Sequence, residues 1–170
     1  MIYLDYQATT PLAPEARDAM LRWLDGPGGT GFGNPHSAHR MGRQAKAAVE
    51  LARDQVAALF PAGGKIVFTS GATEALNLAI RGSGRDGTVS YSAIEHSAVG
   101  DTAQAAGPSH VLNVAKDGQC NTRQDVPDDT RLICVMQVNN EIGTIQPTIE
   151  WYLKAKENNA LFLCLSLIHI

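Results

Sequence analysis

Basic side chains are too few and too scattered in this sequence to neutralise a polyanion. Fourteen lysines and arginines stand against seventeen aspartates and glutamates, which gives a net charge of -3. Nucleic-acid binding depends strongly on neutralised phosphates, so we expect no nucleic-acid partner. Long apolar runs are missing too, because none reaches the roughly 18 to 20 residues that a bilayer requires. We therefore expect no membrane span.

Cysteine is scarce, and its spacing excludes the usual disulfide and zinc patterns. The three cysteines, Cys120, Cys134 and Cys164, are far apart and form no C-x-x-C pair. Separated free thiols are typical of a reducing compartment, and Asp5 lies where a secretory signal would be basic. We therefore expect a cytoplasmic protein. Cys134, inside an apolar run, is expected to be buried and inert.

The 170 residues that remain to be explained are enough for one ordinary domain. Apolar residues at three- and four-residue steps predict a helix from Ser37 to Phe60, and Pro14 predicts the first turn of an earlier helix ending at Leu24. Five later runs have strand character: Lys65–Thr69, Thr88–Tyr91, His110–Val114, Leu132–Val138 and Ala160–Cys164. The first of them is apolar at consecutive positions, as in a strand buried on both faces. Further helices are predicted at Thr73–Arg81, Ser97–Ala106 and Glu150–Asn158.

This alternation predicts an α/β fold, with a mostly parallel sheet flanked by helices and ligands at the carboxyl ends of the strands. We divide the chain into an N-terminal segment 1–13, a large sheet domain 14–164 and a tail 165–170. The tail reads Leu-Ser-Leu-Ile-His-Ile, and nothing follows to cover its apolar surface. Codons that would encode it closely match a transposon end used in sequencing libraries. We interpret the tail as non-native.

A turn of small residues leads from the first predicted strand directly into a helix, through Ser70, Gly71, Ala72 and Thr73. Backbone N–H groups in the first turn of a helix have no internal partner, and with the helix dipole they favour a phosphate or carboxylate. The hydroxyls of Ser70 and Thr73 can cap the helix or donate to the anion. A plain turn with a hydroxyl cap is the alternative to an anion site.

Two more polar segments follow predicted strands. His96 can stack on a flat ligand or shuttle a proton, and at a helix start it can also be a simple cap; Glu95 has the same ambiguity. Asn139, Asn140 and Glu141 interrupt an apolar run, and buried amides need a partner, either a ligand or the loop backbone. All three polar segments fall on one expected rim of a parallel sheet, which favours a shared ligand.

Five motifs occur in a distinctive order: Tyr3–Pro11, Gly33–Ser37, Phe68–Glu74, Glu95–His96 and Val138–Gly143. Together they resemble the cysteine desulfurases of the NifS/IscS type, within the class V aminotransferases, over Ile2 to about Cys164. The resemblance implies a fold-type I (aspartate aminotransferase-like) enzyme that depends on pyridoxal 5'-phosphate. It also implies a homodimer that converts L-cysteine to L-alanine and an enzyme persulfide. The sulfur would pass to an acceptor or scaffold protein for iron–sulfur cluster or thio-cofactor synthesis.

By this resemblance, Ala72 and Thr73 hold the cofactor phosphate, and His96 is a catalytic residue that stacks on the pyridine ring. Asn140 lies beside the cofactor and the substrate carboxylate, and no metal ion is implied. Members of the family are more than twice as long. The resemblance therefore implies an N-terminal fragment that lacks the C-terminal half, the Schiff-base lysine and the persulfide-forming cysteine. Such a fragment is expected to be inactive.

Two alternatives remain at this stage. A selenocysteine lyase or another fold-type I lyase would share the quoted motifs, and its turnover of cysteine and selenocysteine would identify it. A non-catalytic binding protein would use the phosphate-binding turn alone, and predicts a stable chain whose cooperative melt is shifted upward by pyridoxal phosphate. A truncated enzyme instead predicts an exposed sheet edge that promotes aggregation.

Overall fold

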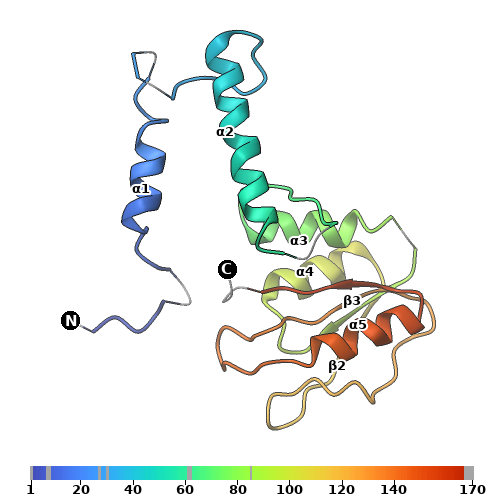
Figure 1. Ribbon diagram of the computed structural model, residues 1–170. Coiled ribbons are helices and arrows are strands. Elements are labelled where there is room, and N and C mark those ends of the chain that lie inside the picture. The colour runs from blue at the N-terminus through green and yellow to red at the C-terminus, as the bar shows by residue number, and fades with distance from the viewer. Residues whose placement is uncertain are drawn as a thin grey trace. The chain divides into compact units, whose positions relative to one another are not determined.

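The computed structural model describes residues 2–6, 9–26, 28–29, 31–60, 63–84 and 86–166. The chain forms two compact units, Met1–Phe68 and Thr69–Ile170. Among the described residues, the first unit contains helices α1 and α2, and the second contains a parallel sheet with helices α3, α4 and α5 (Figure 1). The predicted boundaries after residues 13 and 164 stay a prediction.

Both helices of the first unit were predicted, and both are largely exposed. Helix α1 (Pro14–Leu21) has proline in its first turn, where the missing N–H costs no hydrogen bond, and none of its residues is buried. Helix α2 (Arg40–Ala57) begins after His39, whose Nδ1 accepts the Gly42 amide at 3.2 Å, and it buries Gly42 and Ala45. Each helix is shorter than its predicted range because turns form at its ends.

Lys65–Thr69 is not a strand, which makes the sequence prediction for this segment wrong. Residues 64–69 have neither helix nor strand structure, and Val67 and Phe68 are 66% and 49% exposed. Arg53 of α2 donates to the Ile66 carbonyl at 2.5 Å, and its guanidinium lies 4.9 Å from the Phe68 ring centroid. An apolar, β-branched run supplies strand propensity, but a strand also needs a neighbour that completes its hydrogen bonds. No strand among the described residues pairs with this run.

Among its described residues, the second unit is built on four parallel strands in the order β2-β1-β3-β4. The strands are β1 (Thr88–Ser92), β2 (Ser109–Leu112), β3 (Thr130–Cys134) and β4 (Leu161–Leu163). They confirm four of the predicted strands and the parallel arrangement. Strand β3 ends before the predicted Val138, because beyond Cys134 the Met136 amide donates to the Glu95 side chain.

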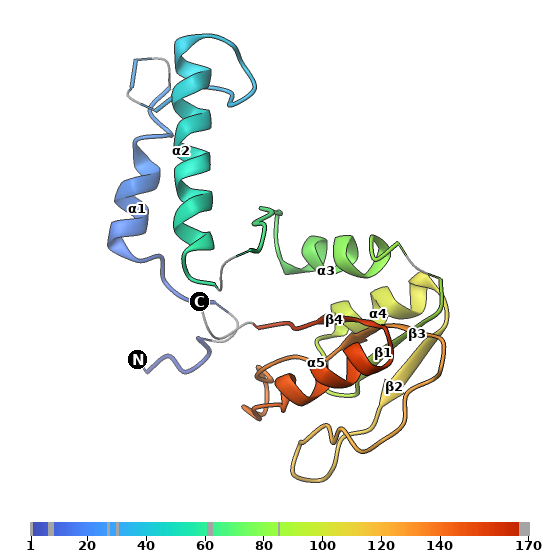
Figure 2. The ribbon, with the colours of Figure 1, turned by 45° about the vertical axis from the view of Figure 1, so that its right-hand side comes forward.

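Helices cover both faces of this sheet. Helices α3 (Ala72–Arg81) and α4 (Ser97–Ala106) lie on one face, and α5 (Thr148–Glu157) lies on the other (Figure 2). Leu132 and Cys134 of β3 pack with α3 and α4, whereas Ile133 and the following Val135 pack with α5. A strand covered on both faces needs apolar side chains at consecutive positions, which is why the sequence revealed β3.

The predicted tail 165–170 lies largely outside the part of the chain that the structure describes. The predicted non-native tail is described only at Leu165 and Ser166, where the Leu165 carbonyl accepts the Gln137 amide at 2.8 Å. Residues 167–170 lie outside the described residues, so the origin of the tail stays a prediction.

Within the described ranges, no helix has the length and apolar character that crossing a bilayer would require.

Candidate functional site

The first turn of α3 presents backbone amides that no described residue binds. Gly71 is the N-cap in an extended conformation, and no side chain of the described residues caps the helix. The first backbone bond runs from the Ala75 amide to the Gly71 carbonyl at 3.1 Å, so the amides of Ala72 and Thr73 precede it and remain without a partner in this part of the chain. Such a turn can accept an anion.

Ser70 takes neither of the two roles considered for it. Its amide and its hydroxyl both donate to Oε2 of Glu74, at 2.6 and 2.5 Å. The hydroxyl bond, followed by the amide bond, lowers the pKa of the Glu74 carboxyl. The plain turn with a hydroxyl cap is therefore not what the structure contains, and the Thr73 hydroxyl has no hydrogen-bond partner among the described residues.

His96 is both a helix cap and an exposed ring. It precedes α4, and its Nδ1 accepts the Ala98 amide at 3.2 Å. With Nδ1 acting as an acceptor, the neutral ring carries its proton on Nε2. The cap thus fixes both the orientation of the ring and the nitrogen that can donate to a ligand. The cap role is confirmed, while the catalytic role of His96 stays a prediction.

The two asparagines after β3 have different environments. Asn139 is buried: its Nδ2 donates to the Ile94 carbonyl at 2.7 Å, and its Oδ1 accepts the amides of Glu141 and Ile142 at 2.8 and 2.9 Å. Asn140 is half-buried, and its side chain makes no hydrogen bond with the described residues. Asn139 therefore fixes the loop, whereas the Asn140 amide is available to a ligand.

Two hollows that share His96 and Ser97 border three of the four predicted site residues, and the first of them lies at the carboxyl ends of β1 and β3. The first, of about 310 Å³, is lined by residues 93–97 and 139–142, including His96 and Asn140. The second, of about 420 Å³, lies between α3 and α4 and is lined by Thr73 and again by His96. His96 thus borders both hollows. Ala72 borders neither, but it lies next to Thr73 at the start of the helix.

Sequence reasoning missed two residues of the second hollow, Asn77 and Arg81. Together with Thr73 they form a ladder along one face of α3: Asn77 Nδ2 donates to the Thr73 carbonyl, and Arg81 Nε donates to Asn77 Oδ1, both at 3.0 Å. The four-residue spacing of these polar side chains was the available signal.

Glu95 was considered only as an ambiguous neighbour of His96, yet its carboxyl is the strongly perturbed acid of this rim. Burial raises the pKa of Glu95 to about 7, although the hydrogen bond from the Met136 amide opposes this shift. Its Oε2 is buried and has no hydrogen-bond partner among the described residues. Sequence alone could not locate this carboxyl, because its burial comes from the packing of neighbouring loops.

The three cysteines are free, and none has the character of a nucleophile. Cys120 and Cys134 are buried, as predicted for Cys134, and Cys164 is exposed. Burial is the first cause that raises the pKa of each thiol, and the nearby Glu95 charge adds to it. A raised pKa keeps each sulfur as the less reactive thiol. In the described ranges, no cluster of His, Cys, Asp or Glu could hold a metal ion.

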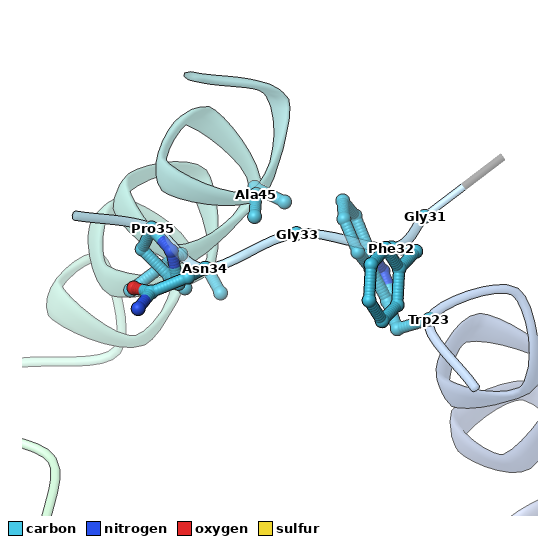
Figure 3. A pocket seen from close by; sticks show the side chains of 10 residues that line it. Trp23, Gly31, Phe32, Gly33, Asn34, Pro35 and Ala45 are labelled. Carbon is cyan, nitrogen blue, oxygen red and sulfur yellow. The ribbon is translucent and has the colours of Figure 1, made fainter. Parts of the chain in front are cut away.

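A third hollow belongs to the first unit and has a different character. It measures about 700 Å³ and is lined by Trp23, by residues 31–35, which include Phe32, and by one side of α2. Figure 3 shows Trp23 and Phe32 at one side of it and Ala45 of α2 at the other. None of the described residues that line it has a titratable side chain, so we do not propose it as the catalytic site.

The fold and the site together define a class of protein before any relative is considered. A parallel α/β sheet carries polar loops at the carboxyl ends of adjacent strands, beside a helix start with unpaired amides. This is the arrangement of an α/β domain that binds an anionic small molecule or cofactor.

The chain belongs to the class V aminotransferase family, whose model matches residues 2–165. It is 42% identical over 179 residues to a mitosomal cysteine desulfurase of Trachipleistophora hominis, an alignment that covers 96% of this chain and 40% of the relative. The chain therefore spans about two fifths of the length of that relative.

Solved structures agree in fold. SspA in complex with cysteine superposes with a TM-score of 0.84 at 31% identity, over 95% of this chain and 49% of SspA. A NifS-like protein from Rickettsia africae has a TM-score of 0.81 at 30% identity, over 96% of this chain and 47% of its own. These similarities confirm the recognised family and the predicted fold class, the α/β large domain of fold-type I enzymes.

Proposed function

We propose that this chain is the N-terminal part of a pyridoxal-phosphate-dependent cysteine desulfurase that converts L-cysteine to L-alanine and an enzyme persulfide. The observation that carries the proposal is that Thr73, His96 and Asn140 border two hollows that share His96 and Ser97. The similarity to a named cysteine desulfurase and to a structure in complex with cysteine supports the substrate. It does not favour the selenocysteine lyase alternative.

The residues present fit pyridoxal phosphate. The amides of Ala72 and Thr73, which no described residue binds, would hold its phosphate at the helix start together with the Thr73 hydroxyl. The exposed His96 ring, held by its cap to Ala98, would lie against the flat pyridine. The unengaged amide of Asn140 would bind a ring substituent or the substrate carboxylate. When bound, the cofactor supplies an electrophilic aldehyde and an electron-withdrawing ring that ease bond breaking in amino acids.

The chain's own groups perform binding, orientation and proton placement in this scheme. Because His96 Nδ1 is occupied by the Ala98 amide, its Nε2 is the atom that would hold or give up a proton. The Asn77 and Arg81 ladder would stiffen the first turns of α3 and so keep the phosphate-binding amides aligned.

We infer that the Schiff-base lysine and the persulfide-forming cysteine lie outside these 170 residues. Lys154 is engaged on α5, where it donates to the carbonyls of Thr122 and Gln124 at 2.8 and 2.5 Å. The raised pKa of all three thiols, and the burial of Cys120 and Cys134, speak against any of them as the nucleophile. The chain by itself is therefore expected to be inactive.

We also propose that the whole protein is a homodimer that passes sulfur to an acceptor or scaffold protein for iron–sulfur cluster or thio-cofactor synthesis. A cytoplasmic location belongs to the same proposal and rests on the free thiols. The relative from Trachipleistophora hominis is named as mitosomal, so an organelle is the alternative location.

Turnover of L-cysteine by the full-length gene product tests this function. Loaded with pyridoxal phosphate and supplied with dithiothreitol, it should form alanine and sulfide in equal amounts, and prefer cysteine to selenocysteine. The 170-residue chain, treated in the same way, should form neither product. Full-length protein that holds the cofactor yet produces no alanine from cysteine would overturn the proposal.

A further inference from the structure

Two hydrogen bonds join the loop after β1 to the loop after β3. Glu95 Oε1 accepts the Met136 amide, and Asn139 Nδ2 donates to the Ile94 carbonyl at 2.7 Å. The first loop continues directly into His96, and the second continues into Asn140. The separation of the two proposed ligand-binding side chains therefore depends on these two bonds.

Burial of the Glu95 carboxyl costs folding free energy. Its Oε2 is buried and has no hydrogen-bond partner among the described residues. The Glu95 carboxylate also forms no salt bridge with any of those residues. Burial of an unpaired carboxyl costs free energy, and it favours the neutral form, as the raised pKa of about 7 indicates. The hydrogen bond that the other carboxyl oxygen, Oε1, accepts from the Met136 amide offsets part of this cost.

We propose that Glu95 is a positioning residue, which holds the His96 loop at a fixed distance from the Asn140 loop by accepting the Met136 amide. It is not a catalytic residue, because its Oε2 is closed off from the solvent and its Oε1 is used by the backbone. Asn139 gives the same pair of loops a second tie through Ile94. The expected effect on cofactor binding rests on the proposed function, whereas the hydrogen bond from Met136 to Glu95, called the tie below, does not.

Several titratable groups surround Glu95 and must be separated from it. The thiols of Cys120, Cys134 and Cys164 interact with its charge, but their pKa values are all raised above the ordinary 9.0, so they stay neutral between pH 5 and about 8. His96 and Glu141 line the same hollow as Glu95. Both are retained in Glu95→Gln, so the comparison with wild type isolates the Glu95 proton.

The amide resonance of Met136 reports the tie directly. In the full-length gene product labelled with ¹⁵N-methionine, the Met136 signal is assigned by its loss in Met136→Leu. Its chemical shift should titrate with a midpoint near pH 7 in wild type, and this midpoint should vanish in Glu95→Gln. A Met136 amide that does not respond to pH between 5 and 9 in wild type would overturn the proposal.

Thermal melting without cofactor gives a second readout of the same carboxyl. The folded chain takes up the Glu95 proton at a higher pH than the ordinary 4.5, so its stability contribution is complete below about pH 4.5 and is lost as the pH rises through about 7. The melting temperature of wild type relative to Glu95→Gln should therefore fall between pH 5 and 8. An unchanged difference over this range would contradict the burial of the carboxyl.

Cofactor affinity then tests what the tie achieves. Glu95→Ala should weaken pyridoxal phosphate binding about tenfold or more, whereas Glu95→Gln, which keeps an acceptor for Met136, should remain within about threefold of wild type. Glu157→Gln, an exposed glutamate on α5, is the matched control and should not differ. Equal affinity of wild type and Glu95→Ala would overturn the positioning role. Wild type that binds no cofactor would overturn the proposed function and leave the Met136 titration as the test of the tie.

Discussion

At the scale of single residues, the site depends on neighbours in sequence that face different surroundings. His96 is exposed and caps α4 through Nδ1, while the adjacent Glu95 carboxyl is buried against Met136. After β3, the side chain of Asn139 is hydrogen-bonded within the loop, whereas the side chain of the adjacent Asn140 makes no hydrogen bond with any described residue. Each loop thus pairs one residue that fixes its shape with one that can meet a ligand.

Substitution of His96 should distinguish its role as the cap of α4 from the proposed contact of its ring with the cofactor. His96→Ala in the full-length protein should lose about 1 kcal/mol of unfolding free energy, because the Ala98 amide loses its acceptor. His96→Asn restores a cap and should recover most of that loss. Both variants remove the ring, so both should bind pyridoxal phosphate more weakly than wild type. The measurements are urea unfolding of the apoprotein and cofactor titration by absorbance.

His39 provides the control for this comparison, since it caps α2 in the same way through Nδ1 and the Gly42 amide. His39→Ala should lose a similar amount of stability and leave cofactor affinity unchanged. If His96→Asn bound the cofactor as tightly as wild type, the predicted contact between the ring and the pyridine would be wrong.

At the scale of elements, the proposed anion site depends on α3. Its N-cap is a glycine without a side-chain bond, and its first-turn amides have no partner among the described residues. Its inner face is anchored by Leu76 and Ile80, which pack against β1, β3 and α4. The anchoring fixes the direction of the amides, which is what preorganised anion binding requires.

Ala72→Pro removes one amide donor from this helix without breaking the helix. Ala72 is the first residue of α3, where proline is tolerated, and Gly71 before it is already extended. Unfolding free energy of the full-length apoprotein should therefore change little. Affinity for inorganic phosphate and for pyridoxal phosphate should fall about tenfold or more, because a bond to a charged group is lost.

Arg40→Pro, at the first position of α2, is the control for the backbone because it also places proline at the first residue of a helix. It should leave both affinities unaltered. Retention of full phosphate affinity by Ala72→Pro would show that the Ala72 amide does not face the anion.

At the scale of the whole molecule, burial is unequally shared. The two core clusters of the second unit lie on opposite faces of the sheet and include fully buried residues such as Trp151, Ile133 and Val89. In the first unit, α1 has no buried residue and α2 buries only a glycine and an alanine. Since burial of apolar side chains dominates stability, the second unit carries most of the folding free energy of these residues.

Hydrogen exchange of the 170-residue chain should reproduce this distribution. Amides of β1 and β3 should exchange slowest, those of α2 at intermediate rates, and those of α1 within the earliest time points, because few apolar contacts oppose local opening there. Mass spectrometry of peptic peptides measures it. Protection of α1 equal to that of β3 would contradict the unequal burial.

Local sequence patterns were sufficient for most elements of this protein. Apolar spacing identified α2, consecutive apolar residues identified β3, and Pro14 marked the start of α1. Polar side chains after predicted strands and the family resemblance together named the candidate site residues, and their roles stay a prediction. These features depend on residues close together in the chain, so periodicity and composition determine them.

What the tertiary structure decided are the properties that depend on distant partners. The run at Lys65–Thr69 has strand composition but no strand beside it, and hydrogen bonds from a neighbour are not encoded in the run itself. The burial of Glu95 comes from packing against a segment some forty residues away at Met136. Only the parallel pairing of β1 with β3 brings those two strand ends together, and with them His96 and Asn140.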